Sequence, residues 1–261
     1  MLTSILLFAT GVFCQAQEEE AKAKIRDFQK KTQKAGVKDE EVEAALHDLA
    51  TVRHPLVLKE LVSWVKKPYR PVRKKSGGGG GFEMEETGIK LNHVAASCIA
   101  DNYEGDPNAA KGLLEAVKAR DAERPKARSM EEEDLVSDLA HFVECFGKVR
   151  CRPAAKDLVP LFRHRYAGVC EAAFEAAADL RSKDLIEPLI QVLAEAEKMK
   201  PAPAKDRGAG AEFGTAEPDR KDVLADGARR ALEATTGERK KDSAEWKKWW
   251  EANRQTFKER E

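Results

Sequence analysis

The most constraining feature of the sequence is the run from residue 169 to 196, which predicts two helices joined by a short turn. Asp184 followed by Glu187 is a capping-box pattern for the second helix, and Pro188 fits its first turn. Each half carries one apolar stripe at helical spacing: Val169, Ala173, Ala176, Ala177 and Leu180, then Ile186, Leu189, Ile190 and Leu193. A helix with a single apolar stripe needs a partner that covers it, so this pair requires neighbours of the same kind.

Four other parts of the chain repeat this organisation. Pro55 and Pro107 occupy matching places at the start of two second helices, and the Lys-Asp-Leu motif at 156 recurs at 183, which is 27 residues later. The apolar stripes of these pairs lie at 42–49 with 58–65, 91–98 with 110–117, 135–146 with 156–161, and 224–235 with 246–250. Repeats of this length are typical of stacked helical hairpins.

Several motifs resemble the HEAT and HEAT-like repeat family. They are Val94-Ala95-Ala96, the Ala-rich stretch from Val169 to Ala173, and Asp-Leu-Ile-Glu-Pro-Leu-Ile-Gln-Val-Leu at 184–193. Ala-Leu-x-x-x-Thr-Gly at 231–237, followed by the tryptophans from Trp246, is similar to the C-terminal end of exported bacterial HEAT-like proteins. The resemblance covers roughly residues 38–257. It implies an all-α fold, a right-handed α-solenoid of about five antiparallel helix pairs.

The N-terminus has the features of a signal peptide. Residues 1–17 contain no Asp, Glu, Lys or Arg, and residues 2–13 are mostly apolar. We therefore expect a cleaved signal peptide over 1–16 and a secreted or periplasmic protein, with a buried N-terminal helix as the alternative. The apolar stretch is too short for a bilayer, so no membrane span is expected after its removal. A charged helix or cap over 17–37 then precedes the HEAT-like domain, 38–261.

Three inserts interrupt the repeats, at 68–86, 121–130 and 199–220. Each lies between the second helix of one pair and the first helix of the next. Equivalent connections of a solenoid follow one edge, so the inserts are expected on the same side. The pair at 169–196 carries no obvious polar cluster, which favours the inserts as the place of partner specificity.

The cysteines predict little chemistry. Cys145 and Cys151 flank a short turn and form the candidate disulfide of an exported protein. Cys98 and Cys170 fit the role of small apolar fillers between helices. The absence of Cys-x-x-Cys spacing argues against a zinc site.

Lys+Arg and Asp+Glu both number 46, which argues against a chain that binds nucleic acid by its overall charge. One segment, 66–75, is locally basic. An acidic glycan, a lipid headgroup or nucleic acid could bind there, or the segment could be solvated and balanced by Glu83, Glu85 and Glu86. The candidate polyanion-binding residues are Lys66, Lys67, Arg70, Arg73, Lys74 and Lys75.

Trp246, Trp249 and Trp250 lie at i, i+3 and i+4 and share one face of the last helix. We expect this face to act as a structural cap that covers the core of the preceding repeat, with an exposed sugar- or peptide-binding platform as the alternative.

The sequence contains no combination of residues that predicts catalysis. None of the five histidines is followed by Glu, so the His-Glu pairs that bind metals in some HEAT-repeat enzymes are missing. We predict a non-catalytic scaffold or adaptor, not an enzyme, that is monomeric, needs no cofactor or metal and binds a protein partner. The alternatives are polyanion attachment through 66–75 and, third, a HEAT-repeat enzyme such as a lyase.

Overall fold

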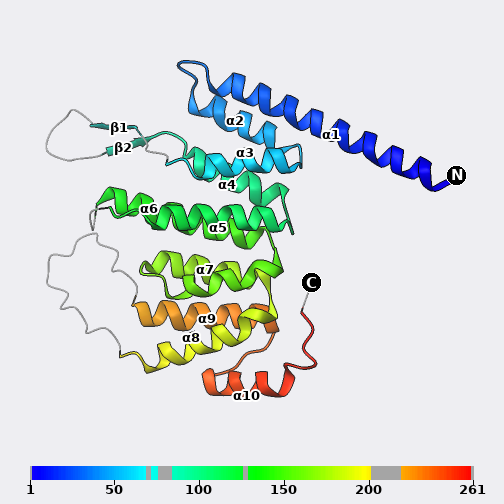
Figure 1. The fold of residues 1–261 in the computed structure, drawn as a ribbon. Coiled ribbons are helices and arrows are strands. Elements are labelled where there is room, and N and C mark those ends of the chain that lie inside the picture. Colours follow the sequence, from blue (N-terminus) through cyan, green and yellow to red (C-terminus); the bar gives the residue numbers. More distant parts are fainter. Residues whose placement is uncertain (1, 69–71, 76–83, 126–128, 201–218, 260–261) are drawn as a thin grey trace. The chain divides into compact units, whose positions relative to one another are not determined.

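The computed structural model describes residues 2–68, 72–75, 84–125, 129–200 and 219–259, and these fold mainly into helices (Figure 1). The chain divides into two compact units, Met1–Arg120 and Asp121–Glu261. The helical class expected from the sequence is therefore correct.

The N-terminal unit contains α1 (Leu2–Thr32), α2 (Asp39–Ala50), α3 (Pro55–Val65), α4 (Leu91–Asn102) and α5 (Pro107–Asp121) up to Arg120. Helices α2 and α3 both pack against α4. The start of α3 is fixed locally, because His54 Nδ1 accepts a hydrogen bond from the Leu56 amide at 3.2 Å. The leucines Leu46, Leu49, Leu61 and Leu113 are among its largest fully buried side chains.

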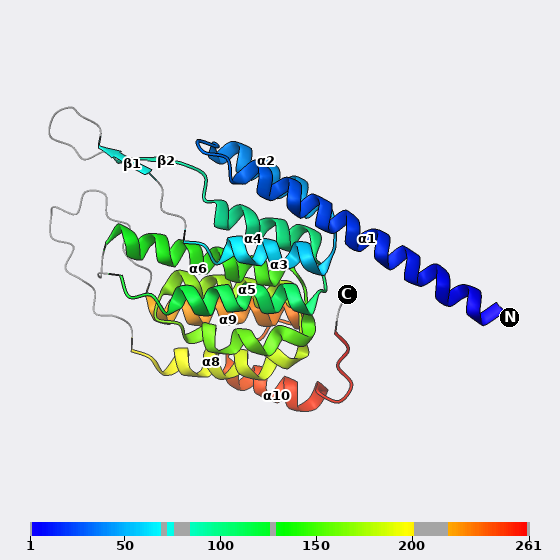
Figure 2. The same cartoon turned by 45° about the horizontal axis from the view of Figure 1, so that its top comes forward.

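Helix α1 is longer than the charged helix expected from the sequence. It continues without a break from Leu2 to Thr32, through the expected signal-peptide boundary. Its C-terminal half lies along α2, and its N-terminal half extends past α2 (Figure 2). Ala21 and Phe28 are buried, and the Phe28 ring meets the edge of Trp64 with the ring centroids 5.6 Å apart. Residues after about 20 thus cover one side of this unit. Among the described residues, no helix has the length and apolar character needed to cross a membrane.

The first insert contains an element that the sequence interpretation missed. Strands β1 (Val72–Lys75) and β2 (Met84–Thr87) form an antiparallel pair. Their register places Arg73 opposite Glu86 and Lys74 opposite Glu85. Opposite charges at facing positions favour strand pairing, so the basic and acidic halves of this insert match each other. The glycines at 77–81, expected to form a linker, lie outside the described residues.

The C-terminal unit has two layers of helices. The first contains α6 (Met130–Lys148), α7 (Ala167–Leu180) and α9 (Arg220–Thr236), with α7 packed against both others. The second contains the 3₁₀ helix η1 (Arg152–Arg163), the 3₁₀ turn η2 (Lys183–Leu185), α8 (Ile186–Lys198) and α10 (Ser243–Asn253). Helix η1 packs on α7, α8 packs on α9, and α10 packs on α8.

Two local predictions for this unit need correction. The second helix of the third pair is 3₁₀ rather than α, and it contains Pro153 and Pro160, which have no amide hydrogen to donate. The turn after α7 is capped by Ser182, whose hydroxyl accepts from the Asp184 amide at 3.3 Å. Asp184 is therefore not the cap, and its carboxylate lies 3.3 Å from Lys156 Nζ instead.

The predicted end of α9 and the predicted start of α10 are both confirmed. Helix α9 ends at Gly237, whose φ of 74° is the left-handed conformation that glycine adopts most readily. Asp242 caps α10 by accepting from the Glu245 amide at 2.9 Å. Of the three tryptophans of α10, Trp246 is 0% exposed, whereas Trp249 and Trp250 are half-buried.

Replacement of Trp246 by alanine should lower the free energy of unfolding by about 3–5 kcal/mol, because it leaves a large cavity in the core. Urea denaturation followed by circular dichroism measures this effect. Lys247→Ala, an exposed neighbour on the same helix, is the control and should change stability by less than about 0.5 kcal/mol. Equal effects of the two substitutions would contradict the assignment of Trp246 to the core.

The crossing of α6 and α7 permits a second stability prediction. A Cβ atom added at Gly147 would lie 2.5 Å from the Cα atom of Ala176, which belongs to the backbone. Gly147→Ala should therefore destabilise by roughly 1–3 kcal/mol in the same measurement. Gly168→Ala is the matched control, because its Cβ would meet Val136 at an ordinary 3.5 Å. A neutral Gly147→Ala would show that these helices can move apart at little cost.

Candidate functional site

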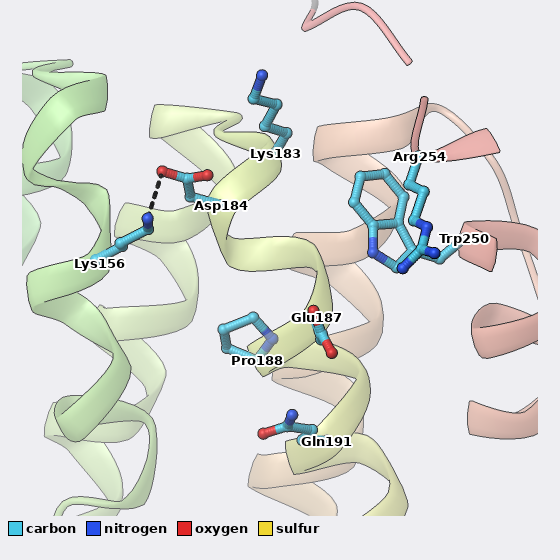
Figure 3. Close-up of a pocket in the computed structure, with 8 residues that line it drawn as sticks. All are labelled: Lys156, Lys183, Asp184, Glu187, Pro188, Gln191, Trp250 and Arg254. Atoms are coloured by element: carbon cyan, nitrogen blue, oxygen red, sulfur yellow. Dashed lines mark ion pairs between the residues drawn. The ribbon is translucent and has the colours of Figure 1, made fainter. Parts of the chain in front are cut away.

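An open groove of about 480 Å³ lies on the second layer of the C-terminal unit (Figure 3). Three elements of that layer contribute to it: η1, the η2–α8 segment and the end of α10. Its lining residues are Lys156, Lys183, Asp184, Glu187, Pro188, Gln191, Trp250 and Arg254. Most of them belong to the helix pair at 169–196, and none belongs to an insert, which differs from the expected location of specificity.

Helix α8 is linked to both of its neighbours in this layer. The guanidinium of Arg163 in η1 donates two hydrogen bonds of 2.7 Å to the carboxylate of Glu195. This contact holds the pKa of Glu195 below its usual value. On the other side, Glu197 accepts from the amide of Ser243 at 3.0 Å and from its hydroxyl at 2.5 Å, at the start of α10. The groove therefore has defined walls.

One wall is formed by Trp250 and Arg254, which follow each other by one turn of α10. Figure 3 shows both side chains across the groove from Glu187. The Trp250 ring is supported from behind, with its centroid 5.8 Å from that of Phe257 and 6.3 Å from that of Trp249. A half-buried tryptophan that is supported in this way offers an apolar surface without a large loss of side-chain entropy on binding.

The groove is lined mainly by charged and polar side chains. Its charges are of both signs, with the Lys156–Asp184 ion pair on the η1 side and Glu187 and Arg254 farther along. Gln191 adds an amide that donates and accepts. The eight lining side chains include no hydroxyl, thiol or imidazole that could serve as an activated nucleophile. This combination of a tryptophan, a proline and mixed charges suits a polypeptide.

The basic segment at 66–75 is described only in part. Lys66 pairs with Glu115 at 2.8 Å, and the Lys67 ammonium lies 3.6 Å from the centroid of the Trp64 ring. Both groups thus interact within the N-terminal unit. Arg70 lies outside the described residues, as do the side chains of Arg73, Lys74 and Lys75. Of the six predicted cations, the structure therefore describes the side chains of Lys66 and Lys67 only.

Two cysteine–histidine contacts were not expected from the sequence, because each joins residues that no known motif links. Cys98 Sγ lies 3.5 Å from His47 Nδ1, and Cys145 Sγ lies 3.6 Å from His141 Nε2. A catalytic cysteine needs a lowered pKa, but burial raises the pKa of the Cys98 thiol to about 12. Within the described ranges, no three His, Cys, Asp or Glu side chains converge on a possible metal site.

The candidate disulfide between Cys145 and Cys151 is not formed in this structure, where both residues are buried thiols. Cys98 and Cys170 are also buried thiols, and burial raises the pKa of Cys170 as well. These two lie where apolar fillers were expected.

The ends of two inserts meet at the turn between η1 and α7. Asp121, where the second insert begins, lies 3.0 Å from His164 Nε2 and 2.8 Å from the Arg165 guanidinium. Arg220, where the third insert ends, donates to the carbonyls of Arg163 and His164 at 3.0 and 2.9 Å. Within the C-terminal unit, these two connections therefore share one edge.

Comparison with known proteins found no protein-family model that matches this chain and no curated protein with significant sequence similarity.

The raised pKa of Cys98 predicts low reactivity. At pH 8 only about one in ten thousand of its side chains should be the thiolate, which is the reactive form. Iodoacetamide should therefore label Cys98 slowly in the folded protein and rapidly in guanidinium, as measured by peptide mass spectrometry. Rapid labelling of the folded protein at neutral pH would instead support a cysteine–histidine nucleophile.

Proposed function

We propose that this protein is a non-catalytic scaffold that binds a protein partner through the groove formed by η1, α8 and α10. We further propose that its helix pairs form a HEAT-like right-handed solenoid and that it acts in an exported compartment after removal of residues 1–16. The observation that carries the proposal is the groove itself, with Trp250 and Arg254 on one wall.

The character of these residues supports a protein partner. Tryptophan and arginine are enriched among the residues that contribute most to protein–protein binding, particularly where neighbours exclude water from them. Trp250 is half-buried against Phe257, so little further area must be covered to remove it from water. The mixed charges of the groove also favour a partner that presents both signs, as most polypeptides do.

The alternative of polyanion attachment through 66–75 has less support. Lys66 and Lys67 already interact with Glu115 and Trp64, and the strand register places Arg73 and Lys74 opposite glutamates. A polyanion would have to compete with the contacts of Lys66 and Lys67. Its binding would also weaken steeply as the salt concentration rises.

The test is affinity purification from the native exported fraction with immobilised wild-type protein and with a Trp250→Ala/Arg254→Ala double variant. A partner that uses the groove should be retained by the wild type through moderate salt washes. Because each hot-spot side chain contributes at least about 2 kcal/mol, the variant should bind at least roughly thirtyfold more weakly.

Lys247→Ala/Lys248→Ala is the matched control, since it changes two exposed residues of the same helix. Melting curves of all variants would identify any loss of folding. Equal capture by the wild type and both variants would contradict a role for the groove. Salt-sensitive capture that depends on 66–75 would support polyanion attachment instead.

A further inference from the structure

A second pocket, of about 240 Å³, lies between the ends of α6 and α7 and is rich in arginine. It is lined by Arg150, Arg152, Asp179, Leu180 and Arg181, which we call the arginine pocket. Three guanidiniums and one carboxylate give it a net positive charge. The planar guanidinium forms paired hydrogen bonds with carboxylates, so an arginine-lined pocket suits an anionic ligand.

Two of these arginines adopt an unusual backbone conformation. Arg150 has a φ of 52° and Arg181 a φ of 48°, so both lie in the left-handed region just after a helix. Glycine is the common residue at such positions, because any other side chain raises the energy of this conformation. Arginine thus occupies a position that favours glycine after both α6 and α7. This repeated use of arginine points to a role for its side chain rather than for the turn.

The chain places one of its own carboxylates beside this pocket, next to Arg152. Glu259 accepts from the Lys183 amide at 2.7 Å and from the Ser182 hydroxyl at 3.4 Å, and it lies 3.6 Å from the Arg152 guanidinium. The Nε atom of Arg152 donates to the Leu180 carbonyl at 3.3 Å. This bond holds the Nε edge of the guanidinium, and Nη1 is the nitrogen that lies 3.6 Å from the Glu259 carboxylate.

The C-terminal segment also connects the two pockets. Arg254 lines the groove, and Glu259, five positions later, lies 3.6 Å from Arg152 of the arginine pocket. Lys183 lines the groove, and its amide donates to Glu259. A polypeptide that bound in the groove and displaced Glu259 could therefore lie in both pockets.

We propose that the arginine pocket binds a carboxylate from an acidic segment of the protein partner, and that Glu259 is an internal competitor for it. This inference rests on the proposed function, because it names the chemistry of the partner segment. A carboxylate is favoured over a phosphate because the group that the chain itself places beside Arg152 is a carboxylate, that of Glu259.

The test uses the full chain and a fluorescein-labelled hexaglutamate peptide, with hexaglutamine as the uncharged probe, in fluorescence anisotropy at low salt. Glu259→Gln should bind hexaglutamate about fivefold more tightly than the wild type, which corresponds to a tail that occupies the pocket roughly four-fifths of the time. Glu251→Gln, at an exposed position of α10, is the control and should leave binding unchanged.

Arg181→Gly separates binding from stability. It relieves the left-handed strain, so the melting temperature should stay the same or rise, while hexaglutamate binding should fall at least about tenfold because a charged ligand group is lost. Arg239→Gln, which removes a charge from a side chain 88% exposed, is the control. Binding that is insensitive to Arg181→Gly and Glu259→Gln would overturn the proposal and leave Glu259 a structural contact.

Three further outcomes are distinguishable. Displacement of hexaglutamate by inorganic phosphate at lower concentration than by acetate would overturn the choice of a carboxylate. Partner capture that is lost in Trp250→Ala/Arg254→Ala but kept in Arg181→Gly would overturn this inference and support the proposed function. Capture lost in neither variant would contradict the proposed function, whereas hexaglutamate binding would still report on the pocket.

Discussion

The C-terminal unit depends on the close packing of α7 against its neighbours. Gly147 of α6 lies against the backbone of Ala176, and Gly227 of α9 lies against the ring of Phe174, which stacks on Phe162 of η1 with the centroids 5.1 Å apart. Small residues at these crossings let α7 be covered by three elements at once. A helix that is buried on most of its surface can only be stabilised by such tertiary contacts, because its own propensity contributes little. Because α7 is rich in alanine, its neighbours can approach it closely, and the C-terminal unit packs around it.

This arrangement also determines where a partner can bind. With α6, α7 and α9 in one layer, the elements η1, α8 and α10 present their outer surfaces to solvent. Side-chain contacts on each flank of α8, to Arg163 and to Ser243, keep these elements at fixed spacing. The groove and the arginine pocket are consequences of that spacing. The groove consists of side chains on ordered helices, which suits a preformed binding surface, since less conformational entropy is lost on binding.

Local signals in the sequence predicted much of the fold. Pro55, Pro107, Gly237 and Asp242 act within one helical turn of their own positions, so they identify helix ends wherever the rest of the chain lies. The 3₁₀ form of η1 was not predictable in this way, because the spacing of its apolar residues also fits an α-helix. The β1–β2 pairing was missed for a related reason. Its facing charges become meaningful only once the register is known.

The candidate site combines features that the sequence predicts with features that it does not. The sequence by itself determined that the chain forms paired helices with apolar stripes, because the period of the side chains depends only on the backbone geometry. It also indicated that the tryptophans of α10 belong together. Only the tertiary structure decided that Trp246 enters the core while Trp250 turns to the groove, since both share one helix face. It also decided that Glu259 meets Arg152 and Lys183, residues 107 and 76 positions earlier in the chain (259 − 152 and 259 − 183). Contacts between residues so far apart follow from packing, which no local pattern encodes.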